Sequence, residues 1–217
     1  MLGPALPTII TRIITLIIAL TFHEFCHAWT ANYFGDDTPR LHGRLTLNPL
    51  HHLDVMGSLM LIVVGFGWAK PVPVNPYALQ RRSPAALMWV SLAGPASNFL
   101  LALLAAIPIR LGITAAFFLA SSKYFPSLNE IVYQFIWINL ALMLFNLLPI
   151  SPLDGEKIAE YFFPPSWARV LEKIAPYGPI ILLAIMFVLP IFGINILGSI
   201  MYPVVNKLVA LLTGGNG

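Results

Sequence analysis

The sequence predicts an all-α polytopic membrane protein, with a core of three transmembrane helices, a re-entrant, partly extended loop and C-terminal hydrophobic helices. The 217 residues are 58% hydrophobic and only 10% charged, and the mean hydropathy is +0.81. These values lie far outside the range of a soluble globular domain. Apolar runs long enough to cross a bilayer recur along the chain and are separated by proline and glycine clusters. A lipid bilayer is therefore an expected partner.

Charge and cysteine content exclude other classes. The net charge of +3 is small and the basic residues are scattered, so a nucleic-acid partner has no support. Cys26 is the only cysteine, which rules out an internal disulfide. The segment after Met1 has no basic leader and no small-residue cleavage site, so we expect the first apolar segment to be retained.

The first span is expected over residues 7–32. It contains a motif of three ionisable side chains, His23, Glu24 and His27. His23 and His27 are one helical turn apart, so both imidazoles project from one face and can hold a zinc ion. Glu24 lies beside them as a possible base. Three ionisable groups in an apolar segment are costly unless they are paired or bind a metal. This pattern is typical of a metal-dependent hydrolase.

The connection over residues 40–82 is the least helical part of the chain. It contains two turn-rich blocks, residues 42–49 and residues 65–76. Between them, residues 56–64 are apolar but too short to span, which favours a re-entrant element packed against protein.

Two short stretches of this connection, residues 45–47 and 71–74, are expected to be strands or extended edges, or else parts of an irregular loop. An exposed edge beside a metal site can hold a peptide by strand addition. The amides of Val72 and Val74 are therefore candidates for substrate binding.

The second span is expected over residues 85–109 and the third over residues 130–148. Gly94 and Pro95 lie near the middle of the second span and allow close helix approach. Asn98, at the same depth, is expected to face protein, with either a packing or a substrate-binding role.

Residues 111–126 are expected to form a connection with a short interfacial helix. Beyond the third span, residues 156–163 form a short amphipathic helix that stops at Pro164. Residues 174–206 carry no charge and are too long for one span, so we expect two hydrophobic helices or a hairpin, broken at Pro190. There is no internal repeat, which disfavours an inverted-repeat transporter.

The lysines and arginines predict the topology. They number five between spans one and two, two between spans two and three, and three between span three and the uncharged C-terminal stretch: Arg40, Arg44, Lys70, Arg81 and Arg82; Arg110 and Lys123; Lys157, Arg169 and Lys173. By the positive-inside rule the first and third groups are cytoplasmic and the N-terminus is outside. His27 and Asp154 then lie on the same, cytoplasmic side of the membrane.

A catalytic zinc takes three protein ligands and keeps an open position for water. Asp154, just past a proline-broken helix end, is the best third ligand, which predicts one zinc per chain held by His23, His27 and Asp154. Glu24 can then take and return protons. Asn146 can donate a hydrogen bond to the substrate backbone or to a developing oxyanion.

With these motifs the sequence resembles the site-2 protease family of intramembrane zinc metalloproteases. The resemblance consists of His23 to His27, of Gly94-Pro95 with Asn98, and of residues 146–149 leading to Leu153-Asp154-Gly155. Residues 46–49 and 67–76 further resemble the short bacterial and archaeal branch that lacks a PDZ domain.

The resemblance implies an intramembrane metalloprotease core over residues 1–163. Residues 164–217 would be C-terminal hydrophobic helices or a hairpin of the same membrane domain. It also implies that His23, His27 and Asp154 are the zinc ligands and that Glu24 is the catalytic acid and base. The substrate would be a transmembrane segment of another protein, and the enzyme would be a multi-pass protein of the cytoplasmic membrane.

One departure from the family pattern concerns Val55 and Ser58, where a proline and a threonine are expected. Other candidate groups have alternative interpretations. Cys26 is either a packing residue or a further zinc ligand. The polar loop residues either bond to backbone and water or contact substrate or a second metal: His42, His51, His52 and Asp54.

A second function class is a non-hydrolytic zinc-binding membrane scaffold or a metal transporter. A transporter lines its path with ionisable groups from several spans, and spans two and four offer almost none. A scaffold has no need of Glu24.

Overall fold

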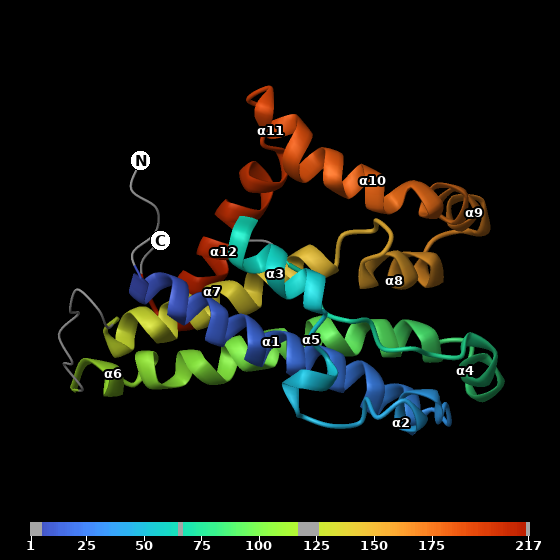
Figure 1. The fold of residues 1–217 in the computed structure, drawn as a ribbon, viewed down its shortest axis with the longest axis horizontal. Helices are drawn as coiled ribbons and strands as arrows, with labels where there is room; N and C mark the ends of the chain where they lie inside the picture. The colour runs from blue at the N-terminus through green and yellow to red at the C-terminus, as the bar shows by residue number, and fades with distance from the viewer. Residues whose placement is uncertain (1–5, 65–66, 117–125, 216–217) are drawn as a thin grey trace. The chain divides into compact units, whose positions relative to one another are not determined.

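The computed structural model describes residues 6–64, 67–116 and 126–215. In chain order its elements are α1 (Leu6–Tyr33), α2 (Thr38–Leu41), η1 (Pro49–His51), α3 (Val55–Val64), α4 (Pro76–Arg82), α5 (Ala86–Arg110), α6 (Ile113–Ala116), α7 (Leu128–Asn146), α8 (Asp154–Phe162), α9 (Pro165–Ile174), η2 (Ala175–Tyr177), α10 (Gly178–Leu183), η3 (Ala184–Val188), α11 (Leu189–Ile191) and α12 (Ile196–Thr213) (Figure 1). The predicted all-α membrane fold is confirmed.

Within the residues that the structure describes, five helical segments are long and apolar enough to cross a membrane: Pro7–Tyr33, Ala86–Arg110, Leu128–Asn146, Pro165–Ile191 and Ile196–Thr213. The first three coincide, within a few residues, with the predicted spans. The last two resolve the uncharged C-terminal stretch into two helical segments, because the chain leaves the helix after Ile191 and re-enters one at Ile196. Asn195 caps the second of these segments by accepting a hydrogen bond from the Gly198 amide.

The connection between α1 and α5 holds α3, whose ten residues are too few to cross a bilayer. Gly65 and Phe66, which belong to the second turn-rich block, lie outside the described residues. Of the predicted connection over residues 111–126, the structure describes residues 111–116, which include α6, and residue 126 before α7.

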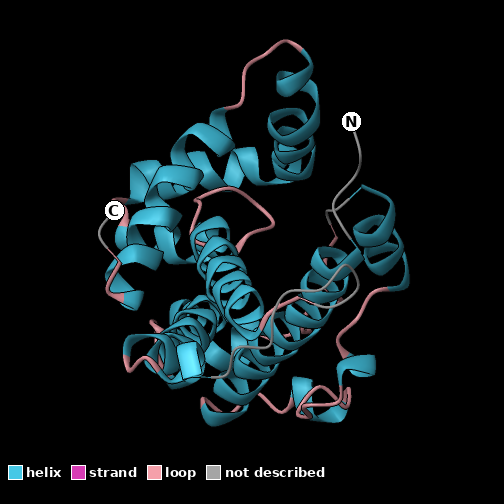
Figure 2. Cartoon of the chain, turned by 90° about the vertical axis from the view of Figure 1, so that its left-hand side faces the viewer, coloured by secondary structure: helices cyan, strands magenta, loops and turns pink. Residues whose placement is uncertain are grey.

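Residues 45–47 and 71–74 do not form strands. Figure 2 shows helices joined by loops, and within residues 6–64, 67–116 and 126–215 no strand is assigned. In these same residues, one isolated antiparallel bridge joins Leu53 to Ala69. The irregular loop, rather than a paired edge, is therefore the form that this connection takes.

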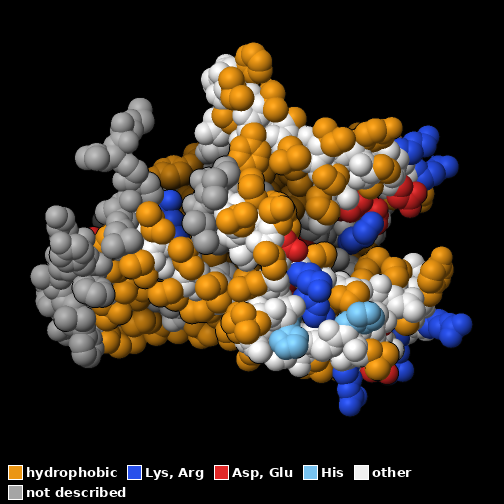
Figure 3. All heavy atoms as spheres, in the orientation of Figure 1, with side chains coloured by type: hydrophobic (Ala, Val, Ile, Leu, Met, Phe, Trp, Pro, Cys, Tyr) orange, Lys and Arg blue, Asp and Glu red, His pale blue; other side chains and the backbone are white. Residues whose placement is uncertain are grey.

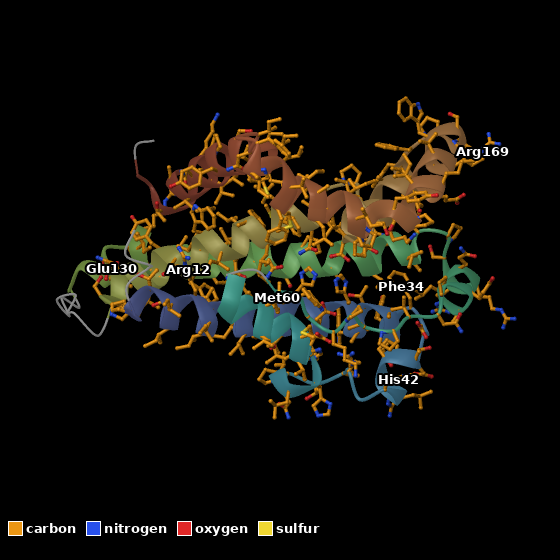
Figure 4. The ribbon with its side chains drawn as sticks, turned by 45° about the horizontal axis from the view of Figure 1, so that its top comes forward. Arg12, Phe34, His42, Met60, Glu130 and Arg169 are labelled. Carbon is orange, nitrogen blue, oxygen red and sulfur yellow. The ribbon has the colours of Figure 1, made fainter. Side chains whose placement is uncertain are left out.

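The chain divides into two compact units. Unit 2, which contains the histidine motif, comprises Ile17–Ser97 and Asn146–Pro176. Its buried apolar cluster joins α1, α4 and α5 through Ala31, Leu79, Ala86 and Val90. Phe34, labelled in Figure 4, packs against this cluster just past the end of α1. The cluster holds the second half of α1, which contains the histidine motif, against the first part of α5.

Unit 1 comprises Met1–Leu16, Asn98–Phe145 and Tyr177–Gly217. Small residues of α5 meet branched residues of α7 and α12 in its core: Ala102, Ala106, Ile136, Leu140 and Val205. Arg110, at the end of α5, donates to the carbonyl of Leu211 near the end of α12 at 3.1 Å. Small residues at such contacts let helices approach closely in a membrane.

Charged side chains are unevenly distributed on the visible surface. In the space-filling view, lysine, arginine, aspartate and glutamate side chains gather over α2, α4, α8 and α9 of unit 2 (Figure 3). These elements all lie in connections or at the margins of spans, as expected where headgroups and water meet a membrane protein.

Candidate metal centre

Three side chains from two distant parts of the chain converge in unit 2. His23 and His27 project from α1, and Asp154 is the first residue of α8. The Nε2 atom of His23 lies 3.1 Å from Oδ2 of Asp154, and Nε2 of His27 lies 3.4 Å from Oδ1. One ligand atom from each residue falls within 4.8 Å of the others. The structure thus brings together the three residues that the sequence predicted as ligands.

The geometry of this group fits a zinc ion. Ligand atoms that lie 2.0–2.1 Å from a tetrahedral zinc are about 3.3 Å from one another. The two distances above are close to this value but end on different oxygens of Asp154, and one atom from each residue lies within 4.8 Å of the others. Oδ2 of Asp154 is buried and, among the residues that the structure describes, makes no aligned hydrogen bond. A buried acceptor without a donor is costly, and a cation between the carboxylate and the two imidazoles would satisfy it.

The ring of His27 is oriented by the backbone of α5. Its Nδ1 atom lies 2.7 Å from the carbonyl oxygen of Val90. A carbonyl only accepts, so Nδ1 carries the proton and donates, which leaves Nε2, on the side of Asp154, as the nitrogen that can bind a metal. Such a partner on the second ring nitrogen fixes the tautomer that a metal ligand needs.

Glycines allow the backbone to approach this site from two sides. A Cβ atom at Gly94 of α5 would lie 2.6 Å from Cε1 of His23 and closer still to the ring of His27. A Cβ atom at Gly155 would overlap the main chain of Leu147 and Leu148. Gly94 therefore lets α5 cover the imidazoles, and Gly155 lets the start of α8 lie against the main chain just past the end of α7.

Asp154 is held in the ionised form. Its burial by itself would raise the pKa of the carboxyl, but the facing imidazoles of His27 and His23 hold that pKa well below its ordinary value. Its place in the first turn of α8 also suits a negative charge. An ionised carboxylate is the form that binds a metal.

Glu24 is adjacent in sequence to the ligand His23, and its carboxylate accepts a hydrogen bond from the loop before α4. Its side chain is buried, and Oε2 accepts a hydrogen bond from the main-chain amide of Val72 at 3.2 Å. Val72 belongs to the irregular segment over residues 70–75, which runs from the bridge at Ala69 to the N-terminus of α4. The amide that the sequence placed on a substrate-binding edge therefore contacts the motif glutamate.

The other predicted site residues have different surroundings. Asn146, the last residue of α7, is half-buried in unit 2. Val74 packs against the apolar cluster of unit 2. Asn98 belongs to unit 1, where it is fully buried and donates to Oδ1 of Asn139 at 3.1 Å.

The remaining candidates stay outside the group of three. The side chain of Cys26 forms a hydrogen bond with the side chain of Ser97. His42 is exposed beyond α2 (Figure 4) and its Nδ1 donates to the Thr38 carbonyl.

His52 is buried, and its Nε2 donates to the carbonyl of Thr46 at 2.7 Å. Asp54 accepts from the Gly57 amide. Within the described residues, the only histidine, cysteine and acidic side chains that cluster as metal ligands are His23, His27 and Asp154.

Sequence reasoning missed several groups around the site. From the sequence, Gly94 indicates helix packing and Arg44 indicates topology. In the structure Arg44 is buried and donates to main-chain carbonyls of the loop. The sequence had no signal for the Val90 carbonyl, because every residue type carries one. The arginine within the turn-rich block over residues 42–49 was the one detectable hint, since such blocks need donors for their carbonyls.

Comparison with known proteins identifies the class. A multi-pass membrane protein with a His, His, Asp group and an adjacent glutamate is a membrane metalloenzyme of the HExxH type. The chain matches Peptidase family M50 over residues 11–117 and 111–189. It belongs to this family of zinc metallopeptidases, and the resemblance to site-2 proteases is confirmed.

Named relatives agree with the family match. The Bacillus subtilis protein named "Putative zinc metalloprotease YwhC" is 40% identical over 195 residues, which cover 89% of this chain and 85% of the relative. The Mycolicibacterium smegmatis protein named "Putative zinc metalloprotease Rip2" is 34% identical over 176 residues, or 78% of this chain and 64% of the relative. The Rip2 protein of Mycobacterium tuberculosis is 30% identical over 185 residues, with 80% and 65% covered. This chain thus spans just under two thirds of the Rip2 proteins. No solved structure matches the chain significantly.

Proposed function

We propose that this zinc metalloendopeptidase cleaves peptide bonds within transmembrane segments of other membrane proteins. The observation that carries the proposal is the position of the motif: His23, Glu24 and His27 lie inside a helix that is long and apolar enough to span a membrane. All three side chains are buried. An active site in such a segment has access to peptide bonds that soluble proteases do not reach.

The residues have distinct roles in this proposal. His23, His27 and Asp154 hold the metal, and the Val90 carbonyl keeps the ring of His27 in the binding tautomer. Zinc, when bound, supplies a Lewis acid that polarises a carbonyl and acidifies water. Glu24 accepts a proton from the attacking water and returns it to the leaving amine. The backbone of α5 at Gly94 covers the imidazoles and limits access from that side.

Substrate contacts come from three further places. Asn146 follows the apolar part of α7 and is proposed to donate to the developing oxyanion. Asn98 is proposed as a substrate contact, although its bond to Asn139 also gives it a packing role. Residues 70–75 are proposed to hold extended substrate backbone, with Val72 and Val74 at their centre. For the substrate to accept a hydrogen bond from the Val72 amide, that amide must first release Oε2 of Glu24.

Cleavage in a defined bilayer tests the proposal. Purified enzyme and a single-span substrate would be reconstituted together in liposomes, and cleavage and bound zinc would be measured. Glu24→Gln is expected to keep zinc and to lower the cleavage rate about 10²–10⁴-fold, the usual contribution of a general acid or base. Cleavage at the wild-type rate in this variant would contradict the proposal and favour a zinc-binding scaffold.

We further propose that the enzyme resides in the cytoplasmic membrane with its active site toward the cytoplasm. The argument is the excess of lysine and arginine between α1 and α5. Asp37 and Gln80 in this connection are exposed. Cysteines placed there in a Cys26→Ser background should resist an impermeant thiol reagent added to intact cells and react after lysis. Labelling of intact cells would reverse the topology.

A further inference from the structure

We propose that Arg44 and Asp36 are positioning residues for peptide hydrolysis. They hold the segment over residues 70–75 so that the main-chain amide of Val72 orients the carboxylate of Glu24. This inference rests on the proposed role of Glu24 as the proton carrier.

Arg44 holds the start of the segment. Its side chain is buried, and its guanidinium donates to the carbonyls of Lys70 and Pro71, each at 3.1 Å, and to the carbonyl of His51. Among the residues that the structure describes, Arg44 forms no ion pair. A buried charge without a counterion is costly, so its bonds to three carbonyls are what compensate it. The planar fork of guanidinium suits two adjacent carbonyls in a way that a lysine ammonium does not.

Asp36 holds the end of the segment. It is 1% exposed, and its Oδ2 accepts from the amide of Asn75 at 2.6 Å. Its Oδ1 accepts from the amide of Thr38 at 3.0 Å, which ties the same carboxylate to the first turn of α2. The side chain of Asn75 then caps α4 by accepting from Tyr77 and Ala78. Two buried ionisable side chains thus fix the segment at both ends through its backbone.

Prolines leave few amides between these anchors. Pro71 and Pro73 have no N–H group and fix φ near −65°. Val72 lies between them, and its amide is the donor that reaches Oε2 of Glu24. A main-chain donor on one oxygen restrains rotation of the carboxylate and leaves the other oxygen to exchange a proton with substrate. The orientation of Glu24 therefore depends on the path of the backbone rather than on the side chain of Val72.

The test compares buried and exposed members of matched pairs in the liposome assay. Arg44→Gln is paired with Arg40→Gln, since Arg40 is exposed on α2. Asp36→Asn is paired with Asp37→Asn, because Asp37 is exposed and makes no cap hydrogen bond. Val72→Pro removes the amide directly. Zinc per chain, kcat and KM are measured for each variant.

Arg44→Gln, Asp36→Asn and Val72→Pro are expected to lower kcat about 10–100-fold, the range seen for groups that orient catalytic ligands. For Arg44→Gln and Asp36→Asn, KM should stay within about twofold. Val72→Pro also removes an amide that is proposed to contact substrate, so its KM can rise. Zinc should remain at one per chain in all three variants. Arg44→Lys keeps a donor for one carbonyl and should recover part of the loss. Arg40→Gln and Asp37→Asn should match the wild type.

A double-substitution cycle separates positioning from general stability. If Arg44 acts through Glu24, adding Arg44→Gln to Glu24→Gln should lower the residual rate no further. A further loss equal to that of Arg44→Gln alone would overturn the inference, as would a loss of zinc or a rise in KM at unchanged kcat. Failure of the proposed function is distinguishable, because then wild-type enzyme itself would not cleave the membrane substrate.

Discussion

Gly94 controls how closely α5 approaches the two imidazoles of α1. The ring of His27 occupies the space that a Cβ atom would need, and the carbonyl of Val90, one turn earlier in α5, binds the same ring. The close approach of the two helices and the orientation of the His27 ring are therefore both set by α5. Because the rings are also fixed by Asp154, they have little freedom to move aside for a larger residue at position 94.

Gly94→Ala is expected to weaken zinc binding about 10–100-fold, since it displaces rings whose orientation the metal requires. Zinc retained during dialysis against a competing chelator is the measurement. Ala96→Val, on an exposed face of α5, is the control for a general effect of added volume. Wild-type retention in Gly94→Ala would show that the rings can shift without loss of the metal.

Asn146→Ala tests the oxyanion role at the end of α7. Removal of a donor to a developing oxyanion lowers kcat about 10²–10³-fold, so we expect a loss of this size with KM and zinc content unchanged. Leu147→Ala, at the exposed neighbouring position, should leave the rate within about twofold. A loss of zinc in Asn146→Ala would instead assign this residue to the support of Asp154.

The metal group itself was predictable from residue spacing, and its surroundings were not. Two histidines four positions apart must share a face of a helix, and charge counting placed Asp154 on the same side of the membrane. Gly94 was located, but its contact with the imidazoles depends on how α5 packs against α1. Arg44 and Asp36 act on main-chain atoms, whose positions follow from loop geometry that residue types alone do not specify.

At the scale of helices, a polar pair lies within the apolar contact of α5 and α7 in unit 1. Asn98 and Asn139 are both fully buried, and the side chain of Asn139 donates in turn to the carbonyl of Phe135 at 2.9 Å. Bonds of this kind connect helices where lipid offers no competing partner. The pair thus helps to set the register of the two helices.

Asn98→Ala is expected to lower the free energy of unfolding by about 0.6 kcal/mol and by no more than about 1.7 kcal/mol, the average and the largest values measured for polar contacts between membrane helices. Unfolding in mixed detergents is the measurement, with Leu100→Ala at an exposed position as the control. A packing role leaves KM unchanged. A raised KM at wild-type stability would support substrate binding by Asn98 instead.

Helices were predictable where the apolar runs were long and ended in proline or glycine. The break between Ile191 and Ile196 follows Pro190, and α7 ends just before Pro149. Residues 71–74 were ambiguous, because alternating proline and valine suits an extended edge and an irregular segment equally. Hydrogen bonds from the side chains of Arg44 and Asp36 hold these residues as an irregular segment. Because both side chains are distant in sequence, the local residue pattern does not reveal these bonds.

At the scale of the whole molecule, one metal ion would connect α1 to α8. Removal of zinc by a chelator is expected to abolish cleavage and to lower the melting temperature, and added Zn²⁺ should restore both. A ligand at 1,000 times its Kd stabilises the folded state by about 4.1 kcal/mol, so the thermal shift should be readily measured. Metal analysis should give one zinc per chain. An unchanged melting temperature after complete removal would argue against a metal that links these helices.

The separation of the ligands along the chain also bears on biogenesis. Asp154 is synthesised more than a hundred residues after His27, and at about 5–20 residues per second the ribosome needs at least about 5 s to reach it. During this interval α1 can enter the membrane, while its histidines and Glu24 still lack their third partner. The complete ligand set first exists after α7 has been made, so the nascent chain passes through a stage at which it cannot yet be a protease.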